Sequence, residues 1–145
     1  MKVIGFNLET INASKAREFK RSNISTEINF SNVDKSKIDV LKDNESIKLS
    51  FKFAVTYKDP DNEKAELKNE ISITGSLLLM VTKDEAKEFL KSWKNKEIPK
   101  DKMLPLYNFI LRKCSVKALQ LEEELGLQLH IPFPQIKGNP QQAQK

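Results

Sequence analysis

Few side chains in this sequence have the types and spacing that catalysis needs. The 145 residues include one histidine, His130, and one cysteine, Cys114. One histidine and one cysteine are too few for a Cys/His metal site, and with a single histidine a Ser-His-Asp triad has no alternative member. The paired carboxylates Asp59 and Asp61 are better explained by a turn than by acid-base chemistry. The four glycines are scattered, which excludes a phosphate-cradling loop of the usual kind. We therefore expect no enzyme activity, no catalytic residue, no metal and no cofactor.

His130 and Cys114 fit structural roles instead. His130 lies in an apolar stretch, LQLHIPFP, where a packing or surface role is the simpler interpretation. A lone cysteine cannot form an internal disulfide, and Cys114 recurs in step with the apolar residues of a predicted helix. We therefore expect a buried thiol and not a reactive one.

The positive charge raises a second function class. The net charge is +5 and the sequence pI is about 9.2, but the lysines are mixed with acidic residues throughout. The regular basic row of Lys48, Lys52 and Lys58 has no aromatic residue beside it. Nucleic-acid binders usually gather basic residues on one face and add exposed aromatics for stacking. A basic adaptor or nucleic-acid-binding module therefore remains the alternative function, and nucleic acid is not the partner that we favour.

The first half of the chain is rich in strands. Apolar and mostly polar residues alternate over 47–57 and again over 71–81, with a turn signal at Asp59–Asn62 between them. This pattern predicts an antiparallel pair. Similar but shorter alternations at 24–30 and 4–10 predict two more strands. A four-stranded antiparallel sheet with one solvated face is expected.

Two helices are predicted after the strands. Thr82 and Glu85 form a capping-box pattern at the start of a short helix, which Pro99 ends. A long helix then begins at Asp101 or near Pro105 and stops at Gly126. Residues on one seam of this helix recur at steps of three and four: Leu104, Tyr107, Leu111, Cys114, Ala118, Leu121 and Leu125.

Other positions of the long helix fall outside this seam. Leu106, Phe109 and Ile110 add apolar surface away from it, so we expect this half to be covered on two sides, by its own sheet and by a second subunit. These three residues are the predicted oligomer interface. The acidic run Glu122–Glu124 is interpreted as a solvated face, although its place near a helix C-terminus is unfavourable for the helix dipole.

The segment after Gly126 is apolar and punctuated by Pro132 and Pro134. The prolines remove backbone donors, so a central strand is not expected here. The chain has the size of one domain, which we place at residues 1–137, followed by a disordered tail at 138–145. It contains no run of eighteen apolar residues and no leader-like N-terminus. We therefore expect a cytoplasmic protein without membrane insertion.

From Met103 to Leu119 and from Gly126 to Ile136 the sequence resembles the SecB family of export chaperones, in particular its divergent SecB-like relatives. Residues 103–119 look like the main SecB helix, with a proline and an aromatic near its start. Residues 126–136 are similar to the Leu- and Pro-rich loop that follows that helix. The strands precede both stretches in the family's order, so the resemblance covers roughly residues 4–137.

The resemblance implies an α+β subunit in which a four-stranded antiparallel sheet is followed by a short and a long helix. It implies pairing into a dimer of dimers, and an ATP-independent holdase that binds unfolded or precursor polypeptides through exposed apolar grooves, including in protein export. Two departures limit what the resemblance implies. The sheet face is expected to carry lysines where the family docks its motor protein, so motor docking is not expected here. Residues 138–145 have no apolar stripe, so we do not expect them to form the family's second long C-terminal helix.

The expected client-binding residues combine the loop with two exposed positions of the last strand. Leu78 and Met80 stand on the otherwise polar face of that strand, where the pattern alone slightly favours burial under a neighbouring subunit or a loop over a client-binding surface. For the loop the pattern favours neither core cover nor client surface, and the resemblance to SecB implies the client surface. The full set is Leu78, Met80, Leu127, Leu129, Ile131 and Phe133.

Overall fold

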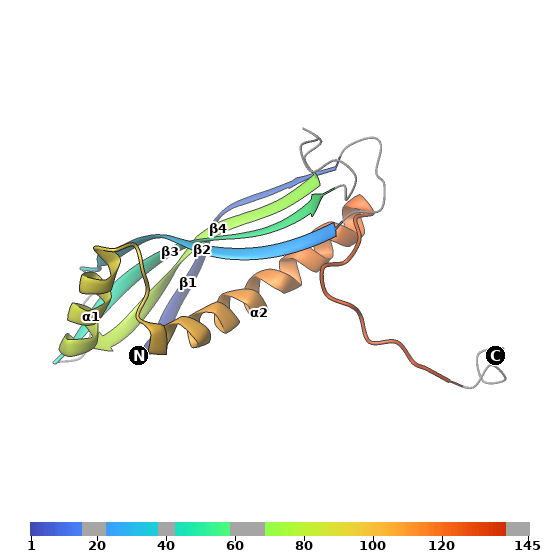
Figure 1. Cartoon of the computed structure of the whole chain (residues 1–145). Coiled ribbons are helices and arrows are strands. Elements are labelled where there is room, and N and C mark those ends of the chain that lie inside the picture. Colours follow the sequence, from blue (N-terminus) through green and yellow to red (C-terminus); the bar gives the residue numbers. More distant parts are fainter. Residues whose placement is uncertain (16–22, 38–42, 59–68, 139–145) are drawn as a thin grey trace.

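A computed structural model describes residues 1–15, 23–37, 43–58 and 69–138 of the chain (Figure 1). The predicted turn at Asp59–Asn62 and all but the first residue of the predicted tail lie outside the described residues. The elements are β1 (Lys2–Ser14), β2 (Asn23–Lys35), β3 (Asn44–Lys58), β4 (Asn69–Thr82), α1 (Lys83–Trp93) and α2 (Lys100–Leu125). The predicted α+β class, with four strands followed by a short and a long helix, is confirmed.

The four strands form one antiparallel sheet in the order β1-β4-β3-β2. The two strands with the clearest alternation, β3 and β4, are therefore central. Most of their apolar residues face the helices and are buried, and Phe53 and Ile73, which pair with each other, are fully buried. The other face carries short polar side chains and lysines and has no helix over it (Figure 1).

The edge strand β1 departs from simple alternation. Its register shifts lie between Val3 and Gly5 and between Leu8 and Thr10, and Val3 and Phe6 pack against the core. Such bulges twist a strand and re-aim its side chains. β1 also runs very close to β4, because a Cβ atom at Gly75 would lie 2.3 Å from the Asn7 carbonyl oxygen. Only glycine fits at that position.

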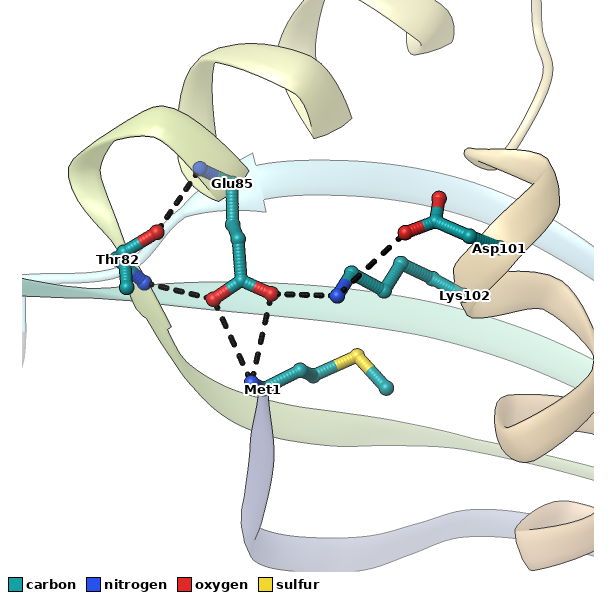
Figure 2. Close-up of polar contacts among 5 residues, drawn as sticks. All are labelled: Met1, Thr82, Glu85, Asp101 and Lys102. Atoms are coloured by element: carbon teal, nitrogen blue, oxygen red, sulfur yellow. Dashed lines mark hydrogen bonds and ion pairs between the residues drawn. The ribbon is translucent and has the colours of Figure 1, made fainter.

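A charged cluster joins α1 to α2 and to the start of β1 (Figure 2). The capping box predicted from the sequence is present: Thr82 Oγ1 accepts from the Glu85 amide at 3.2 Å, and Glu85 accepts from the Thr82 amide at 3.0 Å. Glu85 also pairs with Lys102 Nζ at 2.6 Å and with the Met1 amino group at 3.4 Å. The Lys102 hydrogen bond, followed by the Thr82 amide, lowers the pKa of Glu85 to about 2.

α2 crosses the sheet diagonally on the same side as α1 (Figure 1). Its buried positions mostly follow steps of four: Leu106, Ile110, Cys114, Ser115, Ala118 and Glu122. Each step of four turns the helix by about 40°, so this row winds around α2 and follows the twist of the sheet beneath it. The seam predicted from the sequence ignores this drift and is therefore partly wrong. Two of its members, Leu104 and Leu111, are 67% and 37% exposed.

The same drift corrects the predicted oligomer interface. Leu106 and Ile110 are fully buried against this chain's own sheet, so they have no surface left for a second subunit. Phe109 is only partly buried and contacts Phe6 edge to face, with ring centroids 5.9 Å apart. The expected burial of Cys114 is confirmed, and burial raises the pKa of its thiol to about 11. Neither α1 nor α2 contains an apolar stretch of the length that a bilayer crossing requires.

Candidate functional site

A pocket of about 290 Å³ opens beside the first turns of α2. Its apolar lining includes Phe30 of β2, Trp93 at the end of α1, and Met103 and Tyr107 of α2. The rings of Phe30 and Tyr107 lie 5.5 Å apart. Four partly buried aromatic and thioether side chains that remain reachable make a surface that can take an apolar side chain.

Exposed apolar residues continue from this pocket along α2. Tyr107, Leu111, Ser115 and Leu119 are four residues apart, so each lies one turn further along α2 and about 40° further around it. Leu111 is exposed, whereas Ser115 is covered by the segment that follows α2.

That segment, residues 127–138, is called the arm. It leaves the end of α2 and extends away from the body of the molecule (Figure 1). It begins after Gly126, whose φ of 68° is the left-handed helix ending predicted from the sequence. Ile131 is 38% and Phe133 59% exposed. Phe133 lines a shallow groove together with Val116 and Leu119.

These residues are together called the apolar path. It runs from the aromatic pocket at the start of α2, across Leu111 and the arm, to the groove near the end of α2. Of the ten exposed large apolar side chains among the described residues, six belong to α2 or the arm: Leu104, Leu111, Val116, Ile131, Phe133 and Ile136. Isolated exposed apolar residues are ordinary, but such a concentration marks an interaction surface.

A buried polar network fixes the start of the arm. The carboxylate of Glu122 is fully buried, and it accepts hydrogen bonds from the Tyr57 hydroxyl and from the His130 amide at 2.8 Å. His130 Nδ1 lies 2.6 Å from Glu122 Oε1, and its Nε2 lies 3.1 Å from Ser115 Oγ. Tyr57 also has the Gln128 carbonyl oxygen in reach at 2.9 Å. We call Tyr57, Ser115, Glu122 and His130 the carboxylate network.

Burial and hydrogen bonding together explain the chemistry of this network. Burial, reinforced by the hydrogen bond to Glu122, raises the pKa of Tyr57 well above its usual range, so the hydroxyl keeps its proton. With Glu122 as an acceptor, Nδ1 of His130 must carry a hydrogen, and Nε2 can exchange a hydrogen bond with Ser115. Among the described residues, every buried side-chain nitrogen and oxygen has a hydrogen-bond partner.

Ser115, His130 and Glu122 stand in the order hydroxyl, imidazole and carboxylate that many hydrolases use. Ser115 is only 5% exposed and the His130 side chain 1% exposed, so a substrate carbonyl cannot approach the hydroxyl. The arrangement fits a bond that holds the arm to α2 and β3 better than it fits nucleophilic attack. Within the part of the chain that the structure describes, no group of acidic, histidine or cysteine residues could hold a metal ion.

The structure separates the predicted client-binding residues into three places. Ile131 and Phe133 are exposed on the apolar path, and Leu129 is partly buried on the arm. Leu127 is 5% exposed and belongs to the core.

Leu78 and Met80 do not join the arm in one groove. They lie on the helix-free face of the sheet, where Leu78 pairs with Lys48 of β3. The arm contacts Tyr57, nine residues further along β3, which is roughly 30 Å away at the rise of a strand. Opposite faces and this separation rule out, within one subunit, the shared groove that we expect from the sequence.

Sequence reasoning missed both the aromatic pocket and the carboxylate network. Glu122 was interpreted as solvated, which is wrong, because its donors come from β3 and from the arm, 65 and eight residues away. A local signal existed: Glu122 is four residues after Ala118, on the row of buried positions. From the sequence, we expect His130 to have a packing or a surface role. The packing role is confirmed, because its ring is buried and contacts Phe53 edge to face.

Comparison with known proteins adds one structure. No protein-family model matches this chain, and no curated protein matches it. A solved structure with a similar arrangement is the Mycobacterium tuberculosis Rv1957 SecB-like chaperone in complex with a ChAD peptide from the Rv1956 HigA1 antitoxin. The two are 12% identical in sequence, and the similarity covers 96% of this chain and 91% of that chain, with a TM-score of 0.48.

Proposed function

We propose that this protein is a SecB-like, ATP-independent chaperone that holds unfolded polypeptides on the apolar path. The concentration of exposed apolar side chains on α2 and the arm is the observation that carries this proposal. A holdase needs apolar surface that tolerates many sequences, and Leu, Met and aromatic side chains on a long, open path meet that need. Delivery of bound precursors for export is the part of the proposal that rests on the family resemblance alone.

Pro132 and Pro134 favour the arm as a binding element. Prolines restrict the backbone, so Ile131 and Phe133 are presented on a stiff segment that loses little entropy when a client binds. The carboxylate network anchors that segment at His130. Client side chains therefore meet a surface that is already in place.

The test compares serine substitutions on and off the path. Phe133→Ser combined with Leu111→Ser should weaken binding of a permanently unfolded protein about tenfold or more, because exposed aromatic and aliphatic anchors dominate such contacts. The measurements are fluorescence anisotropy of the labelled client and suppression of its aggregation. Lys87→Ser combined with Glu88→Ser, at exposed positions on α1, is the control and should bind as the wild type does.

Equal binding by wild type, path variant and control would contradict the proposal. The salt dependence addresses the alternative function. Apolar binding persists at moderate salt, whereas binding driven by phosphates weakens steeply. Tight and salt-sensitive binding of RNA or DNA would favour the basic nucleic-acid-binding module instead.

We also propose that the protein is a homo-oligomer, a dimer of dimers. β1 and β2 are the edge strands of the sheet, and β1 exposes Ile4, Leu8 and Ile11. Phe109 remains the helix residue available for a second contact. Phe109→Asp should lower the molar mass measured by light scattering, whereas Asn108→Asp, at the exposed neighbouring position, should leave it unchanged. Equal masses for both variants would contradict the helix contact.

A further inference from the structure

We propose that the apolar path is electrically polarised and that this polarity sets the direction in which a bound polypeptide lies. The preferred client segment has an apolar centre, an acidic group at one end and a basic group at the other. This inference rests on the proposed function, because it concerns how a client lies on the same path.

The start of the path is basic. Lys96 and Lys100 line the aromatic pocket, and Lys96 Nζ lies 5.0 Å from the Trp93 ring centroid. Glu97 also lines the pocket, which leaves two cations against one anion. The N-terminus of α2 is here, and the unpaired amides of a first helical turn add positive potential. An acidic client group is favoured at this end.

The other end of the path is acidic. Glu123 and Glu124 line the same groove as Phe133, and neither forms an ion pair within the described residues. The last turn of α2 contains no basic residue, so these carboxylates add to the negative end of the helix dipole. A cation already lies at that helix end, because Lys15 Nζ is close to Gly126. Such a placement of carboxylates is unfavourable for the helix itself. A basic client group would relieve it, which gives these exposed acidic residues a role.

The spacing of the two ends sets the size of the client segment. Lys100 and Glu123 are separated by 23 residues of α2, which is roughly 35 Å along the helix axis. An extended polypeptide covers that length with about ten residues. The two charged groups should therefore stand about ten residues apart, with apolar residues between them that meet Leu111, Ile131 and Phe133.

The experiment maps the orientation of a bound peptide by photo-cross-linking. The probe is a peptide of about ten residues with two aspartates at one end, leucine and phenylalanine in the centre, and two lysines at the other end. A photoreactive group is placed beside the aspartates, and mass spectrometry locates its cross-links on the full-length protein. A second peptide with the reverse sequence tests whether the charges, and not the chain direction, decide the orientation.

The acidic end of both peptides should cross-link at least about fivefold more often near residues 93–107 than near residues 116–124, since each exposed ion pair changes an affinity by about 1.5- to fivefold and each end has two. The charge-exchanged variant Lys96→Glu, Lys100→Glu, Glu123→Lys and Glu124→Lys has the same net charge and should invert this ratio. The control Lys87→Glu with Glu88→Lys, on the exposed side of α1, should leave it unchanged. Circular dichroism checks that all variants fold.

Equal labelling of both ends in the wild-type protein, or an unchanged ratio in the charge-exchanged variant, would overturn the inference. The anisotropy of the same peptides separates this result from a failure of the proposed function. If the peptide binds the path without a preferred direction, only the inferred polarity is contradicted. Peptide that does not bind at all overturns the proposed function as well.

Discussion

The two halves of α2 meet the sheet in different ways. The first half buries Leu106 and Ile110, which fill the space above β3 and β4 with apolar volume alone. The second half buries Glu122, a carboxylate that needs partners from β3 and the arm to be tolerated. The hydrophobic effect does not depend on direction. A buried carboxylate, in contrast, is stable only when hydrogen-bond donors point at its oxygens.

This difference explains why the arm has one fixed starting point. Core packing of Leu127 and the hydrogen bond from its amide to the Glu122 carbonyl oxygen, at 2.8 Å, fix only the first residue of the arm. The Glu122 carboxylate accepts hydrogen bonds from both the amide and the ring of His130. Only one register of the chain places both donors at this carboxylate. Burying Glu122 costs desolvation free energy, and the hydrogen bonds that offset this cost also define the position of Ile131 and Phe133.

The largest expected effect comes from removing the carboxylate. Glu122→Ala leaves the Tyr57 hydroxyl and the His130 donors buried without an acceptor, and should lower the free energy of unfolding by about 3 to 5 kcal/mol. Urea denaturation measures this loss. Glu123→Ala, at the exposed neighbour, should change it by less than about 0.5 kcal/mol.

The apolar half provides the contrast for the same experiment. Leu106→Ala should cost about 2 to 5 kcal/mol through the cavity that it leaves. The two losses are similar in size, but only Glu122→Ala should abolish protection of the His130 amide against hydrogen exchange under native conditions. Equal protection in both variants would show that the network does not hold the arm.

A smaller effect is expected from one hydroxyl of the network. Tyr57→Phe keeps the ring on β3 and removes a single donor, while Glu122 retains the His130 amide and ring. The expected loss is about 1 to 2 kcal/mol. Denaturation of the double variant Tyr57→Phe with His130→Ala, compared with the single variants, measures the coupling between the two donors. A sum of independent effects would mean that the residues do not act as one network.

The smallest effect belongs to the charged cluster at the other end of the molecule. The pKa of Glu85 is lowered to about 2 in the folded chain, so its stabilisation is present above the ordinary glutamate pKa and is lost as the pH falls toward 2. Glu85→Gln should cost less than about 1 kcal/mol at neutral pH and flatten the pH dependence of stability between about 4.5 and 2. Unfolding curves across this range, with Glu88→Gln as the exposed control, test it. An unaltered slope would contradict the assigned pairing.

The parts of the molecule that sequence reasoning predicted correctly depend on local signals. The alternation in β3 and β4, the capping box at Thr82 and Glu85, and the left-handed Gly126 are each set by residues a few positions apart. Their physical causes act within a strand or a single helical turn. The sequence alone was therefore sufficient for the order and the type of the elements.

The parts that it missed depend on residues far apart in the chain. The winding of the buried row around α2 follows the twist of a sheet built from four separated strands, and this moved Leu104 and Leu111 to the surface. The donors to Glu122 come from β3 and from beyond the helix end. A run of three glutamates looks solvated until those partners are known, and the aromatic pocket similarly requires β2, α1 and α2 together.

The pairing of β1 with β4 has a consequence for the order of events on the ribosome. β1 is made before the other strands, but its partner β4 is complete only when Thr82 has been added. Ser14 pairs with Glu70, so more than fifty intervening residues must be made before this pair can form. β2, β3 and β4 can pair with their neighbours in turn as they emerge, because each contact closes a short loop. The nascent chain therefore leaves Val3 and Phe6, which pack against the core of the finished fold, uncovered until β4 and the helices have been made. A protein proposed to shield unfolded chains is itself, for that interval, a chain that needs shielding.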